Sequence, residues 1–123
     1  MVKLVLIIKK RADISQADFE NHWRGAHALL VQKHAETLRI KKYVQSIGCQ
    51  SEVVAQLRAE RGWSSETEVD GVAELYWDSE EDMAAGMSTP EGQAAMKELG
   101  EDELNLGDAL DVLMTKENVV INR

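Results

Sequence analysis

The sequence contains few of the residues that mark disulfide-rich, disordered or collagen-like proteins. Its 123 residues include one cysteine, one proline and eight glycines. Cys49 alone can form neither an intramolecular disulfide nor a cysteine metal cluster, so nothing indicates an oxidising compartment and we expect a cytoplasmic protein. With 44% hydrophobic and 29% charged residues, the chain should fold around a substantial core. Its length predicts a single domain over residues 1–123.

Basic residues and long apolar runs are also scarce. Lys and Arg number 14 against 22 Asp and Glu, which gives a net charge of -8. The chain therefore lacks the excess of positive charge that binding to phosphate backbones requires. The longest apolar segment, residues 2–8, is too short to cross a membrane, and its basic residues lie on the wrong side for a signal peptide. We expect neither nucleic-acid nor membrane binding.

Three common catalytic motifs are missing. The sequence has no Gly-rich phosphate loop, no G-x-S-x-G elbow and no dinucleotide-binding fingerprint. Kinase-like, elbow-hydrolase and Rossmann functions are therefore not expected.

Apolar and alternating stretches predict four strands, because β-branched runs and a period of two are typical of half-buried or buried strands. The predicted strands are residues 2–8, 41–49, 70–78 and 110–121. In the third, alternation puts Val72, Glu74 and Tyr76 on one face and Ala73, Leu75 and Trp77 on the other.

Capping residues predict where the helices begin. Ser15 is a suitable N-cap for a long helix that reaches about Thr37. Ser79 caps a second helix, which Pro90 interrupts and residues 91–99 resume. Residues 51–62, which end at Trp63, are either a short helix or a mobile excursion, and residues 64–68 are a predicted polar loop.

The resulting order is strand, helix, strand, strand, helix, strand. It predicts an α+β, ferredoxin-like βαββαβ fold, with both helices on one face of a four-stranded antiparallel sheet. Such a sheet leaves its second face bare, so we expect a homodimer in which another copy covers it.

The first predicted helix presents two of its three histidines to the sheet. At about 100° per residue from Trp23, His34 lies at about +20° and His27 at about +40°, while His22 lies at about -100°. His27 and His34 therefore share the stripe of Phe19 and Trp23, and His22 is expected to be solvated.

His27 is the strongest candidate for proton transfer, because imidazole titrates near neutral pH. The alternative is a rim histidine satisfied by a carbonyl or water, since no neighbour in the sequence supplies an orienting carboxylate. His27 and His34 lie about 10 Å apart along an ideal helix, too far to chelate one ion, so no metal site is expected.

Two tyrosines and one glutamate are further candidates. Tyr43 and Tyr76 could orient a substrate oxygen or serve as amphipathic wall residues. Glu74 is either a general base in a dry pocket or part of an ion pair that fixes the dimer. Trp23 and Trp77 either wall a pocket or belong to the core. The acidic run that includes Asp102, Glu103 and Asp108 is expected to be solvated unless the fold buries one of them.

Several short motifs follow one another over nearly the whole chain. They are, in sequence, Ser15, Phe19, Trp23, His27, Tyr43, residues 70–79, Asp102, Glu103, Leu106, Asp108, Glu117, Val119 and Val120. Together they resemble the EthD family. Leu106 departs from the phenylalanine that many relatives carry, and residues 51–63 form an insertion between the two middle strands.

The resemblance implies a dimeric α+β barrel with a cleft between sheet and helices, and it places His27, Asp102, Glu103 and Asp108 at positions of the family motif. It also implies a small enzyme that works without a cofactor. The expected substrate is a hydrophobic, oxygenated, cyclic or aromatic molecule, and the expected reaction is of lyase, cyclase or isomerase type.

In this hypothesis His27 and Glu74 move protons, Tyr43 or Tyr76 holds a carbonyl or phenol oxygen, and the other pocket residues bind substrate. Those pocket residues are Trp23, Trp77 and His34. The alternatives are a non-catalytic dimer that binds a small ligand or supports an oxygenase pathway, and haem handling through His27 or His34.

Overall fold

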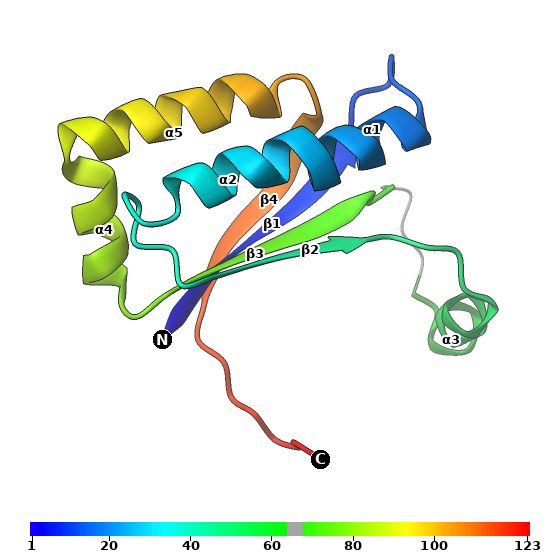
Figure 1. Ribbon diagram of the computed structural model, residues 1–123. Coiled ribbons are helices and arrows are strands. Elements are labelled where there is room, and N and C mark those ends of the chain that lie inside the picture. The colour runs from blue at the N-terminus through cyan, green and yellow to red at the C-terminus, as the bar shows by residue number, and fades with distance from the viewer. Residues whose placement is uncertain (64–67) are drawn as a thin grey trace.

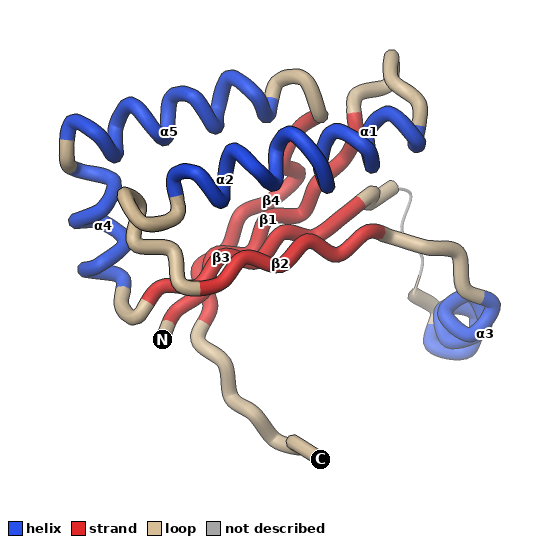
Figure 2. Tube along the Cα trace, in the orientation of Figure 1, coloured by secondary structure: helices blue, strands red, loops and turns tan. Residues whose placement is uncertain are grey.

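The computed structural model describes residues 1–63 and 68–123 (Figures 1 and 2). Most of the predicted polar loop at residues 64–68 lies outside the described residues. The elements, in chain order, are β1 (Val2–Lys10), α1 (Gln16–His22), the π-helical turn η1 (Trp23–His27), α2 (Ala28–His34), β2 (Lys42–Ile47), α3 (Glu52–Arg61), β3 (Gly71–Trp77), α4 (Glu80–Ser88), α5 (Pro90–Glu103) and β4 (Gly107–Thr115).

The strands form one antiparallel sheet in the order β2-β3-β1-β4. Helices α1, α2 and α5 lie over one face, whereas α3 and the C-terminal segment project on the opposite side (Figure 1). The predicted α+β, ferredoxin-like fold is confirmed. No helix in the described ranges is long and apolar enough to cross a membrane.

Side-chain caps place the helix starts where the sequence predicts them. The Ser15 hydroxyl accepts a hydrogen bond from the Asp18 backbone amide, and Ser79 caps α4 in the same way. Pro90 occupies the first turn of α5, where a missing backbone N–H leaves no donor unpaired. The chain therefore turns between α4 and α5 instead of forming one continuous helix.

The predicted last strand, residues 110–121, is wrong at both ends. β4 begins at Gly107 and ends at Thr115, which pairs with Lys3 near the start of β1. Beyond Thr115 the neighbouring strand has almost ended, so residues 116–123 have no β1 backbone to pair with. They are exposed and lie outside the sheet.

The core lies between the helices and the sheet, in two clusters. The first contains Phe19, Trp23, Ala73 and Leu106, and the second contains Val31, Leu38, Ala95 and Leu99. Trp23 packs directly on the β3 backbone at Gly71, where a Cβ atom would come within 2.7 Å of the indole ring. The absence of a side chain at Gly71 lets this ring lie against the strand.

Candidate functional site

A cavity of about 230 Å³ lies between the helices and the covered face of the sheet. Its walls are mainly apolar and include Leu4, Leu6, Val31, Leu75 and Trp77. An apolar cavity of about 150 Å³ can hold benzene, so this one can hold a small ring compound. The cavity has the character of a small-molecule site.

Four polar or ionisable residues line this cavity. They are His27, Tyr43, Glu103 and Asp108, contributed respectively by η1, β2, α5 and β4. A mainly apolar chamber with a few polar groups from separate elements can hold a hydrophobic molecule and orient its oxygens.

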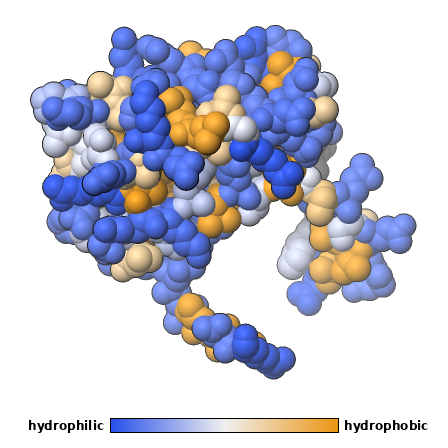
Figure 3. All heavy atoms as spheres, in the orientation of Figure 1, coloured by the Kyte–Doolittle hydropathy of each residue, from blue (hydrophilic) through white to orange (hydrophobic). Residues whose placement is uncertain are grey.

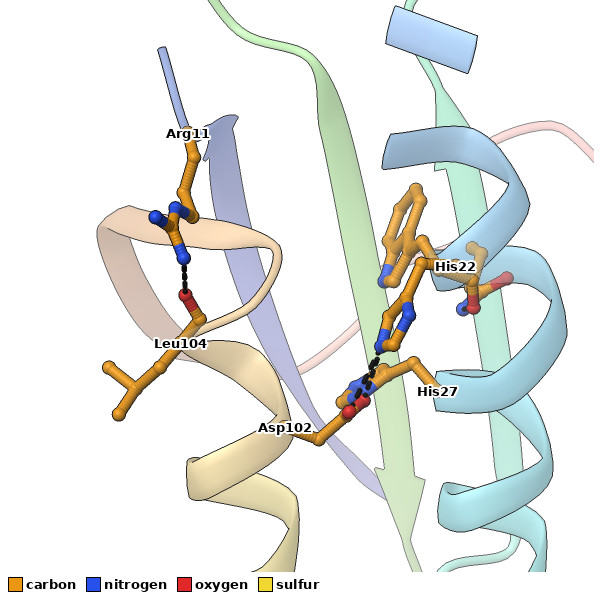
Figure 4. Close-up of polar contacts among 7 residues, drawn as sticks. Arg11, His22, His27, Asp102 and Leu104 are labelled. Carbon is orange, nitrogen blue, oxygen red and sulfur yellow. Dashed lines mark hydrogen bonds and ion pairs between the residues drawn. The ribbon is translucent and has the colours of Figure 1, made fainter. Parts of the chain in front are cut away.

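His27 is buried and hydrogen-bonded to a carboxylate. Its Nδ1 lies 2.7 Å from Oδ2 of Asp102, a residue in the last turn of α5. Nε2 of His22 lies 2.9 Å from the other oxygen of the same carboxylate, so one aspartate holds two imidazoles (Figure 4). The predicted solvated role of His22 is therefore wrong.

The π-helical turn explains why the ideal helical wheel separated these histidines. At about 100° per residue, five positions place His22 and His27 about 140° apart. In a π-helix the hydrogen bonds run from i to i+5, so residues five apart lie closer to the same side of the helix than they do in an α-helix. The turn Trp23–His27 thus brings both rings to Asp102.

A polar contact from the sheet accompanies the widened turn. The Gln45 side-chain amide donates to the Trp23 carbonyl at 2.7 Å and to the Tyr43 hydroxyl at 3.1 Å. These hydrogen bonds connect β2 to η1 beside the cavity. Burial raises the pKa of Tyr43, against the smaller opposing effects of its hydrogen bonds to Gln45 and Trp23, so its hydroxyl stays protonated at neutral pH.

Two adjacent carboxyl groups have pKa values displaced in opposite directions. Burial acts to raise the pKa of Asp102, but hydrogen bonds from His27 and His22 outweigh it and hold the value below the usual range. Although Glu103 as a whole residue is exposed, burial of its carboxyl raises its pKa. One carboxylate is thus fixed as an anion, and its neighbour gains a proton more readily.

Two predicted site residues lie on the other face of the sheet. Glu74 forms an ion pair with Lys3 of the same chain and does not line the cavity. The Tyr76 ring lies beneath the ammonium groups of Lys3 and Lys42, at 5.5 and 5.1 Å from the ring centre. The predicted alternation of β3 is correct, and it separates both side chains from His27.

The other predicted residues divide by position. Trp23, Trp77 and Tyr43 line the cavity together with His27. His34 does not line it; its Nε2 lies 2.8 Å from a Glu98 carboxylate oxygen. His34 and Glu98 form a second histidine–carboxylate pair outside the cavity.

Reasoning from helical spacing and local sequence missed Asp102 and His22. Asp102 is 75 residues from His27 in the chain, so no local pattern reveals their hydrogen bond. The available signal was the acidic pair at residues 102 and 103, which the family resemblance marked. Among the described residues, no group of three or more His, Cys, Asp or Glu side chains could hold a metal ion.

Comparisons with known proteins identify the same fold. The EthD domain model matches residues 11–109. Among curated protein sequences, none matches this chain.

Several solved structures resemble the chain over almost its full length. An EthD-family protein from Bacillus halodurans is 21% identical, covers 96% of this chain and 99% of its own, and has a TM-score of 0.63. A dimeric ferredoxin-like protein from Bacteroides fragilis is 15% identical, with 94% and 95% covered and a TM-score of 0.56. SnoaB from Streptomyces nogalater, a cofactor-independent oxygenase, is 11% identical, with 99% and 97% covered and a TM-score of 0.56.

Proposed function

We propose, from the premise that this chain belongs to the EthD family, that it is an enzyme needing no cofactor. Its substrate is a small hydrophobic molecule with a cyclic or aromatic skeleton and at least one oxygen function. The reaction is a proton-transfer reaction of lyase, cyclase or isomerase type. Glu74, Tyr76 and His34 have no part in the proposed chemistry, because none of them lines the cavity.

The observation that carries the proposal is the hydrogen bond between Asp102 and a cavity-lining histidine. Because the carboxylate accepts from Nδ1 of His27, the neutral imidazole keeps its proton there and Nε2 is the basic nitrogen. A substrate C–H or O–H in the cavity can pass its proton to Nε2. The imidazolium so formed is stabilised by Asp102 and can return the proton to another substrate atom.

Tyr43 and Glu103 supply the complementary donors. The neutral Tyr43 hydroxyl can hydrogen-bond a carbonyl or phenol oxygen on which negative charge develops. Glu103, whose pKa is raised by burial, can donate a proton to the same oxygen. Trp23 and Trp77 wall the apolar part of the cavity and hold the ring of the substrate.

We also propose that the protein is a homodimer. On the face of the sheet opposite the helices, Val5 pairs with Leu113 of β4 and Ile7 pairs with Val72 of β3. Leu113 is 46% exposed, so apolar surface is left for a partner to cover. The dimeric state of the Bacteroides fragilis protein supports the same arrangement.

A ligand screen followed by turnover assays tests the enzymatic proposal. Phenols, lactones, polyketide-like aromatics and haem are added separately to wild type and to His27→Ala, and the melting temperature is measured. Binding to the native state raises that temperature as RT ln(1 + [L]/Kd). We expect a phenol, lactone or aromatic polyketide to stabilise wild type more than His27→Ala.

The stabilising compound is then assayed for turnover. We expect His27→Gln to lower kcat by about 10²- to 10⁴-fold, the usual contribution of a general acid–base. His34→Gln is the matched control, because His34 also pairs with a carboxylate but lies outside the cavity; its kcat should match wild type. Saturable binding without product would indicate the non-catalytic alternative, and a Soret shift at stoichiometric haem would indicate haem handling.

A further inference from the structure

The chain exposes more surface than a compact domain of its size. Its accessible area is 8654 Å², whereas a folded monomer of 13.8 kDa is expected to expose about 6,600 Å². The excess of about 2,000 Å² exceeds the roughly 800 Å² that each partner buries in a standard protein–protein interface. The excess is therefore large enough to supply an interface with another chain.

Two segments carry much of this exposed apolar surface. Helix α3 has no buried residue, and Val53 on it is 68% exposed. Three consecutive residues of the C-terminal segment, Val119, Val120 and Ile121, are 66%, 83% and 69% exposed. Both segments stand away from the body on the side opposite α1, α2 and α5, and both carry apolar atoms at their surface (Figures 1 and 3).

A groove of about 1060 Å³ runs beside α3. Val54, Ala55 and Val69 contribute apolar surface to it, and its charged side chains are mostly acidic. These charged side chains are Glu20, Glu52, Glu68, Asp70 and the single basic Arg58. Residues 118–123 read N-V-V-I-N-R, with an apolar centre and Arg123 as the one charged side chain. The apolar centre of the segment thus matches the apolar surface of the groove, and the Arg123 guanidinium can pair with one of its carboxylates.

The groove and the segment lie at opposite corners of the sheet. α3 follows the end of β2, which is one edge of the sheet, and residues 116–123 follow the end of β4, which is the other edge. β4 ends opposite Lys3 and β2 ends opposite Gly71, so the two corners are also at opposite ends of the strands. A two-fold rotation that exchanges these corners brings each segment to the groove of the other copy.

We propose that residues 118–123 of one copy bind in the groove beside α3 of a second copy, in two equivalent contacts. The proposal rests on the homodimer inferred above and gives the insertion between β2 and β3 a function. α3 stands off the body because it forms the outer wall of a site for the partner's C-terminal segment. Eight extended residues, 116–123, span about 26 Å, enough to pass beyond a second sheet packed about 10 Å away.

Cys49 provides a direct test, because it lines the groove and is free. The variant V120C, which keeps Cys49, should form a disulfide-linked dimer in a glutathione redox buffer. The double variant C49S/V120C should not. The matched control L29C places a new thiol at a 66% exposed position on the helix side and should give no covalent dimer above wild type.

Sedimentation equilibrium gives a second, independent readout. Deleting residues 118–123 should raise the dimer dissociation constant at least tenfold, whereas Leu29→Ser should leave it unchanged. A monomeric wild type would overturn the homodimer and this exchange together. A dimeric wild type with no Cys49-dependent cross-link and an unchanged constant after the deletion would overturn the exchange alone, and a cross-link in C49S/V120C would overturn it in favour of paired C-terminal segments.

Discussion

The two faces of the sheet are built from the same strands but differ in what their side chains contact. Ala73, Leu75 and Trp77 on one side of β3 line a cavity. Glu74 and Tyr76, their alternate neighbours, lie on the side away from α1, α2 and α5 and pack against lysines. An ionisable residue in mid-strand is therefore not evidence of a site by itself, because the face it occupies decides what it can contact.

The charged groups on the two faces also respond oppositely to pH. The pKa of Asp102 is lowered because hydrogen bonds from His27 and His22 outweigh the opposing effect of burial. The pKa of Lys3 is raised, chiefly by its hydrogen bond to Glu74. One pair stabilises an anion beside the cavity, and the other stabilises a cation on the open face.

The largest expected difference between the two faces is in how much a truncated side chain lowers the free energy of unfolding. Phe19 of α1 is fully buried between the helices and the sheet, so Phe19→Ala should lower the free energy of unfolding by about 3–5 kcal/mol. Val72→Ala on the face away from the helices removes fewer atoms from a half-buried side chain, so it should lower this free energy less, by about 1–2 kcal/mol. Urea denaturation at one fixed protein concentration measures both. Equal losses would contradict a core confined to the helix side.

Asp102→Asn should lower the free energy of unfolding at pH 7 by about 1–3 kcal/mol, because two imidazoles lose an ionised acceptor. The folded pKa of Asp102 is below the unfolded value of about 3.9. Its contribution is therefore present above that pH and lost as pH falls through the folded pKa.

When the free energy of unfolding is measured between pH 7 and pH 2, it should fall less steeply with decreasing pH in Asp102→Asn than in wild type. Glu98→Gln is the control, since Glu98 also accepts from a histidine but is far more exposed than Asp102; its loss at pH 7 should be much smaller. An equally steep fall in Asp102→Asn would disprove the lowered pKa.

Enlarging a side chain that lines the cavity should weaken ligand binding, whereas enlarging one on the opposite face of the sheet should not. Ala73 is 4% exposed and lines the cavity, so Ala73→Leu should weaken binding of the best compound from the thermal-shift screen at least tenfold, about 1.4 kcal/mol. Val72→Phe also enlarges a side chain, on the opposite face of the sheet, and should leave binding unchanged. Isothermal titration calorimetry measures both, with circular dichroism to verify folding. Equal affinities would place the ligand elsewhere.

The smallest effect concerns the ion pair on the open face. Lys3→Met should lower the free energy of unfolding by about 1 kcal/mol or less, the usual value of a pair in contact with solvent. Because the folded pKa of Lys3 is raised, its contribution is present below the unfolded value and lost as pH rises through the folded one. Wild type should therefore lose stability at high alkaline pH more steeply than Lys3→Met in urea titrations.

The local chemistry of the sequence determined most of the fold. The hydroxyls of Ser15 and Ser79 mark helix starts, Pro90 marks a break, and the alternation from Val72 to Trp77 assigns side chains to faces. These signals depend on neighbours within a few residues. The end of β4 does not follow from its own sequence, because it depends on where β1 begins, more than 100 residues earlier in the chain.

The candidate site was predictable only in part. Trp23 and His27 could be chosen from the sequence because the helical period directs them toward the sheet, whereas the alternation of β3 assigned Trp77 to one face without showing which face the helices cover. The hydrogen bond between His27 and Asp102 could not be predicted, because it depends on the packing of α5 against η1 and on a π-helical turn. A helical wheel assumes a regular α-helix and does not contain such a turn. Periodicity determines the direction in which a side chain points, and only tertiary packing decides which group it meets.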